Sequence, residues 1–126
     1  TSDIQVLLVE DNEINQAVAK NMLENLTIDV DIANNGIEAL ALLSNKSKRY
    51  HAILMDCQMP KLDGYETTKL IRSEQAYNVH RFTPIIALTA HAMEGDEAKC
   101  LTAGMNSYIA KPISSDRLKS ELEKWI

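Results

Sequence analysis

Hydrophobic residues follow two patterns along this chain of 126 residues. Runs of aliphatic and β-branched residues, too short for helices, predict five strands at Gln5–Val9, Val30–Ala33, Ala52–Met55, Ile85–Leu88 and Tyr108–Ala110. Between them, apolar residues recur at helical spacing in three sets: Ile14, Val18, Met22 and Leu26; Ile37, Leu40 and Ala41; and Leu118, Leu122 and Trp125. The chain is therefore predicted to alternate strands with helices that each have one apolar face.

Polar residues and glycine mark where some of these helices begin and end. Two N-cap residues stand three positions before an acid that can reach back, Asn35 before Glu38 and Asp63 before Glu66. Gly104 predicts a helix end, because glycine adopts the left-handed conformation of a C-cap. The least regular stretches, Ser44–Tyr50 and Ser73–Thr83, are predicted to be surface loops.

The alternation of strands and helices predicts the fold class. Consecutive parallel strands need a crossover connection, and right-handed crossovers through helices cover both faces of a sheet. Val6–Val9 and Ile53–Met55 are apolar at every position, as expected of central strands buried on both faces. We therefore expect a doubly wound α/β domain with a parallel sheet.

Composition favours one globular domain over residues 1–126, with 45% hydrophobic and 25% charged residues. There are 13 Lys and Arg against 18 Asp and Glu, a net charge of −5, which argues against direct nucleic-acid binding. The one basic cluster, Lys46, Lys48 and Arg49, is predicted to be a solvated loop. The longest apolar run, Ala39–Leu43, is far short of the roughly 20 residues of a membrane span, so no membrane contact is expected.

Cysteine content and the first residue suggest the setting of the chain. Cys57 and Cys100 are too few for a disulfide framework, and no signal segment is evident, so a cytoplasmic location is expected. The sequence opens with Thr1 rather than Met. We therefore expect it to be one domain of a longer multidomain protein.

Polar residues follow the predicted strands where ligands bind in open α/β sheets, at their carboxyl ends. They are Glu10, Asp11 and Asn12 after the first strand, Asp56, Cys57 and Gln58 after the third, Thr89 and His91 after the fourth, and Lys111 after the fifth. Three carboxylates, a hydroxyl and an ammonium group are thus expected to converge on one edge of the sheet.

This combination favours metal-assisted phosphoryl transfer. Two carboxylates about 4 Å apart repel by on the order of 4 kcal/mol at an effective dielectric of 20, so a cation is expected among them. Oxygen ligands suit Mg²⁺, and Mn²⁺ can substitute. Lys111 and Thr89 carry groups that bind phosphoryl oxygens. Asp56, at the end of an apolar strand, is the candidate phosphoacceptor, with Glu10 and Asp11 as metal holders.

The sequence resembles the receiver domains of two-component response regulators over nearly its whole length. The motifs are Val9–Asn12 (VEDN), Met55–Gly64 (MDCQMPKLDG), Ala87–Ala90 (ALTA) and Lys111–Pro112 (KP). Receivers of hybrid sensor histidine kinases are the most similar, through Asn15, Thr89–Gly95 (TAHAMEG) and Ala103–Met105 (AGM). The resemblance implies a flavodoxin-like five-stranded sheet of order 2-1-3-4-5 and a switch in a phosphorelay.

The resemblance also implies a separate role for each acidic residue. Asp56 would accept a phosphoryl group from a phosphohistidine of a partner. Asp11, Asp56 and the backbone carbonyl of Gln58 would ligate Mg²⁺. Many receivers have aspartate in place of Glu10, which is one methylene longer, so Glu10 would act largely through water.

Further roles are implied for residues around these acids. Thr89 and Lys111 would bind the phosphoryl oxygens, and the peptide between Lys111 and Pro112 would be cis. Tyr108 would be the aromatic switch residue. Gln58 and His91, each two residues beyond a site residue, would tune hydrolysis of the phosphorylated form.

Several simpler interpretations stay open. Asp11 could only cap the first helix, Tyr108 could only pack, and Cys57 could be a small buried residue facing away from the site. The first helix carries Asn15, Gln16 and Lys20, which indicate a solvated face or a partner-docking face.

Three other functions fit the sequence less well than that of a receiver. A phosphatase with an aspartate nucleophile needs a general acid at position 58, where Gln58 cannot serve. A flavodoxin-like electron carrier needs a first loop rich in Ser, Thr and Gly, which this chain does not have. A pseudo-receiver would have lost the acids, which this chain keeps. The expected partners are the phosphohistidine domain of a histidine kinase and a histidine phosphotransfer domain. The domain would catalyse only its own phosphorylation and dephosphorylation, within a hybrid kinase or, alternatively, as a stand-alone regulator or beside another output domain.

Overall fold

A computed structural model describes residues 4–44, 50–57, 63–73, 83–89, 94–110 and 113–125. In these ranges, strands and helices alternate strictly. The order is β1 Gln5–Val9, α1 Glu13–Asn25, β2 Asp29–Ala33, α2 Gly36–Leu43, β3 Ala52–Asp56, α3 Gly64–Ser73, β4 Ile85–Thr89, α4 Glu94–Ala103, β5 Ser107–Ala110 and α5 Ser115–Trp125.

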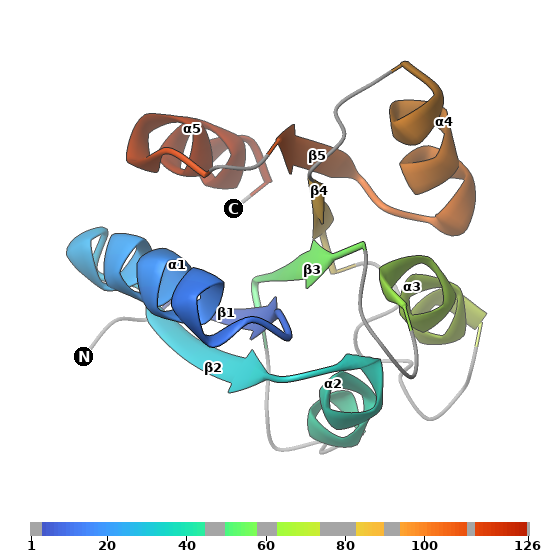
Figure 1. Cartoon of the computed structure of the whole chain (residues 1–126), viewed down its shortest axis with the longest axis horizontal. Coiled ribbons are helices and arrows are strands. Elements are labelled where there is room, and N and C mark those ends of the chain that lie inside the picture. Colours follow the sequence, from blue (N-terminus) through green and yellow to red (C-terminus); the bar gives the residue numbers. More distant parts are fainter. Residues whose placement is uncertain are drawn as a thin grey trace.

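The strands form one parallel sheet of order β2-β1-β3-β4-β5 (Figure 1). The predicted doubly wound fold and its strand order are confirmed. The strands β2, β3, β4 and β5 are each one residue longer than predicted, because Asp29, Asp56, Thr89 and Ser107 join them. Asp56 and Thr89 thus belong to the last positions of buried strands rather than to the loops beyond.

Two hydrophobic layers enclose the sheet, and alternate strand residues feed each of them. The layer under α1 and α5 contains Leu8, Leu54, Leu88, Leu23 and Leu118. The layer under α2, α3 and α4 contains Val9, Met55, Ala87, Ile71 and Cys100. Figure 1 shows the same division, with α1 and α5 on one side of the sheet and the other three helices opposite. Burial on both faces explains why the central strands are apolar throughout.

The predicted inward face of α1 is partly wrong. Ile14 is 75% exposed and Val18 45% exposed, whereas Ala19 and Leu23 are buried against the sheet. Each four-residue step turns 400° around a helix, which is more than one full turn, so a stripe with this spacing rotates gradually around the helix instead of following one face. The expected stripe therefore starts on the solvent side and reaches the core only near Met22.

The other predicted helix faces give a mixed result. In α2, Ile37 is 56% exposed, Ala41 is also exposed, and Leu40 packs against the core; the buried positions are Gly36, Ala39 and Leu43. In α5, Leu118 and Leu122 are buried as predicted. Trp125, in the last turn of α5, is 38% exposed.

The predicted helix boundaries are confirmed. Asn35 caps α2 by accepting a 2.9 Å bond from the backbone N–H of Glu38, and Asp63 accepts the same bond from Glu66 at 2.9 Å. Gly104 follows α4 with φ +108°, a conformation that few residues other than glycine adopt. Most of the two predicted loops, residues 45–49 and 74–82, lies outside the described residues.

The chain enters and leaves the fold at the same edge of the sheet. Each helix runs back along the sheet, so α5 ends near the edge where β1 begins. Ile4, before β1, and Leu122, in α5, line one shared cavity of about 410 Å³. No helix in the described ranges is long and apolar enough to cross a membrane.

Candidate functional site

The turn from β1 into α1 carries two adjacent acids. Glu10 is 1% exposed, whereas Asp11 is exposed. Asn12 caps α1, since its side-chain oxygen accepts bonds from the backbone N–H groups of Ile14 at 2.9 Å and Asn15 at 3.1 Å. The interpretation of Asp11 as the helix cap is therefore wrong, because Asn12 fills that position.

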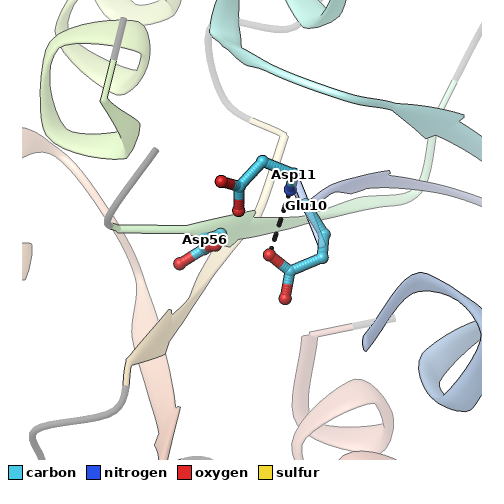
Figure 2. Close-up of side chains that lie close together, drawn as sticks. All are labelled: Glu10, Asp11 and Asp56. Atoms are coloured by element: carbon cyan, nitrogen blue, oxygen red, sulfur yellow. Dashed lines mark hydrogen bonds between the residues drawn. The ribbon is translucent and has the colours of Figure 1, made fainter. Parts of the chain in front are cut away.

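The third acid comes from the neighbouring strand. Asp56 is the last residue of β3 and is 4% exposed. One carboxylate oxygen from each of Glu10, Asp11 and Asp56 lies within 4.8 Å of the other two (Figure 2). Glu10 Oε2 also accepts a 3.1 Å bond from the backbone N–H of Asp11, drawn as the dashed line in Figure 2.

This arrangement fits a small divalent cation. The three carboxylates repel one another, and a cation of charge +2 placed among them removes that repulsion. Mg²⁺ prefers oxygen ligands and keeps several of its own waters, so a site open on one side suits it. Within the described residues, no other group of three potential metal-binding side chains is as close.

The start of α3 is packed directly against the end of β3. A Cβ added at Gly64 would lie under 3.0 Å from the carbonyl oxygen of Asp56 and 3.0 Å from Cα of Cys57. The backbone N–H of Gly64 donates to the carbonyl of Cys57 at 3.3 Å. Glycine at this position lets α3 lie against the backbone of the acid, and so fixes where β3 ends.

Thr89 lies at the same edge of the sheet, on the strand beside Asp56. It ends β4 and is 4% exposed, one residue beyond Leu88, the register partner of Asp56. Tyr108, half-buried on β5, is the register partner of Ala87. Since alternate residues of a strand share a face, Thr89 and Tyr108 lie on the same face of neighbouring strands. Tyr108 also packs against the hydrophobic layer under α2, α3 and α4.

Cys57 faces that layer, as predicted for a small buried residue pointing away from the acids. It is 2% exposed, and Cys100 of α4 and Tyr65 of α3 contact its thiol. Burial raises the pKa of Cys57 to about 12, so the thiol stays protonated at neutral pH. Nζ of Lys99 lies 4.4 Å from the ring centre of Tyr65. Cys57 is thus a packing residue between β3 and two helices.

Four predicted participants lie outside the described residues: Gln58, His91, Lys111 and Pro112. Their roles stay predictions. The structure adds one residue that the sequence reasoning did not place at the site, Gln16 of α1, whose side-chain amide contacts the carbonyl of Glu10 at 2.6 Å. Its position on the first turns of α1, close in sequence to the two acids, was the only signal.

Comparison with known proteins agrees with the site. Residues 6–123 match the family described as response regulator receiver domain. The chain is 39% identical over 121 residues to hybrid signal transduction histidine kinase A of Dictyostelium discoideum, covering 96% of this chain but only 6% of the length of that kinase. The first eight curated relatives are all histidine kinases, and the chain spans 6% to 16% of their lengths.

Two solved structures are informative about the site. The receiver domain of a sensor histidine kinase from Pseudomonas aeruginosa PAO1 has a TM-score of 0.87 and 45% identity over 98% of both chains, and has a magnesium ion coordinated in its active-site cleft. The receiver domain of a Saccharomyces cerevisiae response regulator, solved with a histidine phosphotransfer protein, has a TM-score of 0.85 and 38% identity, covering 97% of this chain and 88% of that one. By its fold, its acidic cluster and these matches, the chain belongs to the response regulator receiver domains, and it is similar to those of hybrid histidine kinases.

Proposed function

We propose that this receiver takes a phosphoryl group onto Asp56 from the phosphohistidine of a partner, with Mg²⁺, and later loses it slowly to water. The observation that carries the proposal is the carboxylate of Asp56 at the end of a buried strand, within 4.8 Å of the acids of Glu10 and Asp11. An aspartate in that place is held rigidly and surrounded by groups that need a cation.

The chemistry asks little of the protein beyond placement. An Asp56 carboxylate oxygen attacks phosphorus, an O–P bond forms, and the N–P bond of phosphohistidine breaks as the neutral imidazole leaves. Bound Mg²⁺ would neutralise the phosphoryl oxygens and so remove their repulsion from the acids. Asp11 and Asp56 would ligate it directly with the carbonyl of Gln58, and Glu10 would act through water. Hydrolysis later removes the phosphoryl group, because water attacks phosphorus, the bond to the Asp56 oxygen breaks, and inorganic phosphate is released.

Thr89, at the end of β4, and Lys111 would bind the phosphoryl group. The hydroxyl of Thr89 would donate to one phosphoryl oxygen and the ammonium of Lys111 would bind another. If Thr89 moves toward the phosphoryl group, it vacates space on the face that it shares with Tyr108, and the tyrosine ring would move inward. Gln58 and His91 would govern how fast water attacks.

The solvent side of α1 is the proposed docking face for the phosphohistidine partner. Ile14 and Val18 are apolar and exposed, and they lie on the helix that begins next to Asp11. An apolar surface beside the acceptor suits a helical partner that must bring its histidine close to Asp56. A related receiver has been solved with a histidine phosphotransfer protein, which makes such a protein a proposed partner here.

For the parent chain, we propose a hybrid sensor histidine kinase, because the matched curated relatives are histidine kinases that are much longer than this chain. The alternative is a stand-alone regulator or a receiver joined to another output domain. A histidine kinase core in the sequence before Thr1 would favour the first, and an output domain after residue 126 would favour the second.

The test of the acceptor uses a small phosphodonor, acetyl phosphate, with Mg²⁺ and mass measurement of the intact chain. We expect one acid-labile phosphoryl group, and none on Asp56→Asn. Asp29→Asn, at an exposed acid where β2 begins, is the matched control and should gain the group as wild type does. Undiminished uptake by Asp56→Asn would overturn the assignment.

The two neighbouring acids should differ in how much they matter. Asp11→Ala should abolish uptake, since it removes a direct metal ligand, whereas Glu10→Ala should weaken uptake less. The measurement is the Mg²⁺ concentration at half-maximal rate. Equal loss in the two variants would contradict the water-mediated role of Glu10.

A further inference from the structure

The amide of Gln16 bridges the site to the neighbouring β2–α2 turn. Its Nε2 donates to the carbonyl of Glu10 at 2.6 Å and to Oδ1 of Asn34 at 2.8 Å, so both of its protons are used. Asn34 in turn donates to Oε1 of Glu38, from its side chain at 2.9 Å and from its backbone at 3.1 Å. A chain of hydrogen bonds thus runs from α2 through α1 to the acid that follows β1.

The direction of each bond in this chain is set by its two ends. The carbonyl of Glu10 and the carboxylate of Glu38 can only accept, so the two amides between them must each present their nitrogen one way. Gln16 must point its nitrogen at Glu10, and Asn34 must then offer oxygen to Gln16 and nitrogen to Glu38. Neither amide can rotate by 180° without placing two acceptors together. The bridge is therefore a fixed structure rather than one of several equivalent arrangements.

The bridge acts on the peptide unit that joins the two acids. The carbonyl of Glu10 and the N–H of Asp11 belong to the same plane. Gln16 holds the oxygen side of this plane, while Oε2 of Glu10 accepts from the N–H side at 3.1 Å. On the other side of the residue, the N–H of Glu10 donates to the carbonyl of Ala33 at 3.0 Å. The tilt of this plane sets where the Asp11 side chain leaves the backbone.

We propose that Gln16 is a positioning residue of the metal site, which fixes the Glu10–Asp11 peptide plane so that the Asp11 carboxylate meets that of Asp56. The inference rests on the proposed function only in that these acids bind a divalent cation. It also assigns Gln16 an inward role, distinct from the solvated or partner-docking face to which its sequence neighbourhood pointed.

The test measures binding of Mn²⁺ alone, by the electron paramagnetic resonance signal of the free ion. Gln16→Met keeps the length of the side chain and removes its donors, and we expect Mn²⁺ affinity to fall roughly tenfold, the low end for loss of a residue that orients a metal ligand. Ala17→Met adds the same side chain at the next, exposed position and should bind Mn²⁺ within about twofold of wild type.

A second variant guards against a folding defect in the first. Asn34→Ala removes the acceptor that holds Gln16 from the far side, and we expect a smaller loss of affinity in the same direction. Because both changes break one bridge, the double variant should lose little more than Gln16→Met alone. Losses that multiply in the double variant would overturn the bridge.

The outcomes separate this inference from the proposed function. A wild-type chain that binds no Mn²⁺ overturns the proposed function and this inference with it. Wild-type binding that Gln16→Met leaves unchanged, or that Ala17→Met weakens equally, overturns this inference alone.

Discussion

Replacing Gly64 by alanine tests whether close packing of α3 on β3 sets the position of the acceptor. The added Cβ would stand 3.0 Å from the carbonyl carbon of Asp56 and from Cα of Cys57, and nearer still to the carbonyl oxygen. Carbon atoms pack best at about 3.5–4.0 Å, so the two backbones must separate by roughly 0.5–1 Å. Both partners are backbone atoms, so no flexible side chain can absorb the change.

The displacement should have two measurable effects. Overpacking of this kind costs about 1–3 kcal/mol, which urea unfolding reports as a lower midpoint with an unchanged slope. Metal ligands tolerate shifts of about 0.2 Å, so moving Asp56 by several times that should weaken Mg²⁺ binding about tenfold or more. The Mg²⁺ dependence of phosphoryl uptake measures the second effect.

Gly104→Ala is the matched control. Its Cβ would meet Cγ of Arg72 at 2.9 Å, and its φ of +108° strains any L residue, so it should destabilise the fold by a similar amount. Gly104 precedes β5, at the edge of the sheet opposite the acids. Phosphoryl uptake by the Gly104→Ala variant should therefore depend on Mg²⁺ as it does in wild type. Gly64→Ala with wild-type stability and metal affinity, or equal loss of affinity in both variants, would refute the reasoning.

Two further predictions concern buried titratable groups. Burial acts to raise the pKa of Glu121, but hydrogen bonds from Ser107 and Lys124 and the charges of Lys124 and Arg117 outweigh it, so its pKa lies below the ordinary 4.5. The ionised Glu121 side chain therefore stabilises the fold fully above pH 4.5, and this contribution is lost as the pH falls through the lowered pKa. In urea unfolding, the Glu121→Gln variant should lose less free energy of unfolding than wild type between pH 6 and about pH 3. An identical loss would contradict the argument. Cys57, whose pKa burial raises to about 12, and buried Cys100 should react with iodoacetamide at neutral pH only after unfolding, as mass spectrometry would show; rapid labelling of the folded chain would be inconsistent with this packing.

The sequence predicted best what depends on where a strand ends. Asp56 follows an unbroken apolar run, and parallel strands leave all such ends at one edge, so its proximity to Glu10 and Asp11 needed no knowledge of side-chain geometry. The residues that bind or position around them are harder to predict. A polar residue on a helix reads the same whether its amide faces solvent or, as with Gln16, turns back to a loop carbonyl.

Helix orientation was the other limit. Ile14 and Val18 share the apolar spacing of core residues, and only the placement of α1 on the sheet shows that Ala19 and Leu23 make the contact instead. Spacing alone gives the relative angles of side chains around a helix, and it leaves the rotation of the helix against its sheet undetermined. That rotation is what leaves an apolar surface beside the acids.

The entry and exit of the chain at one edge, with the acids at the other, constrain how any attached domain can reach Asp56. A five-residue strand at about 3.3 Å per residue is roughly 17 Å long, so a linker from either end of the chain must span at least that distance to reach the acids. About five or six fully extended residues cover the distance, and a flexible linker needs on the order of ten. Linker length would thus select whether a joined histidine serves its own receiver or only that of a neighbouring molecule, without any change to the site.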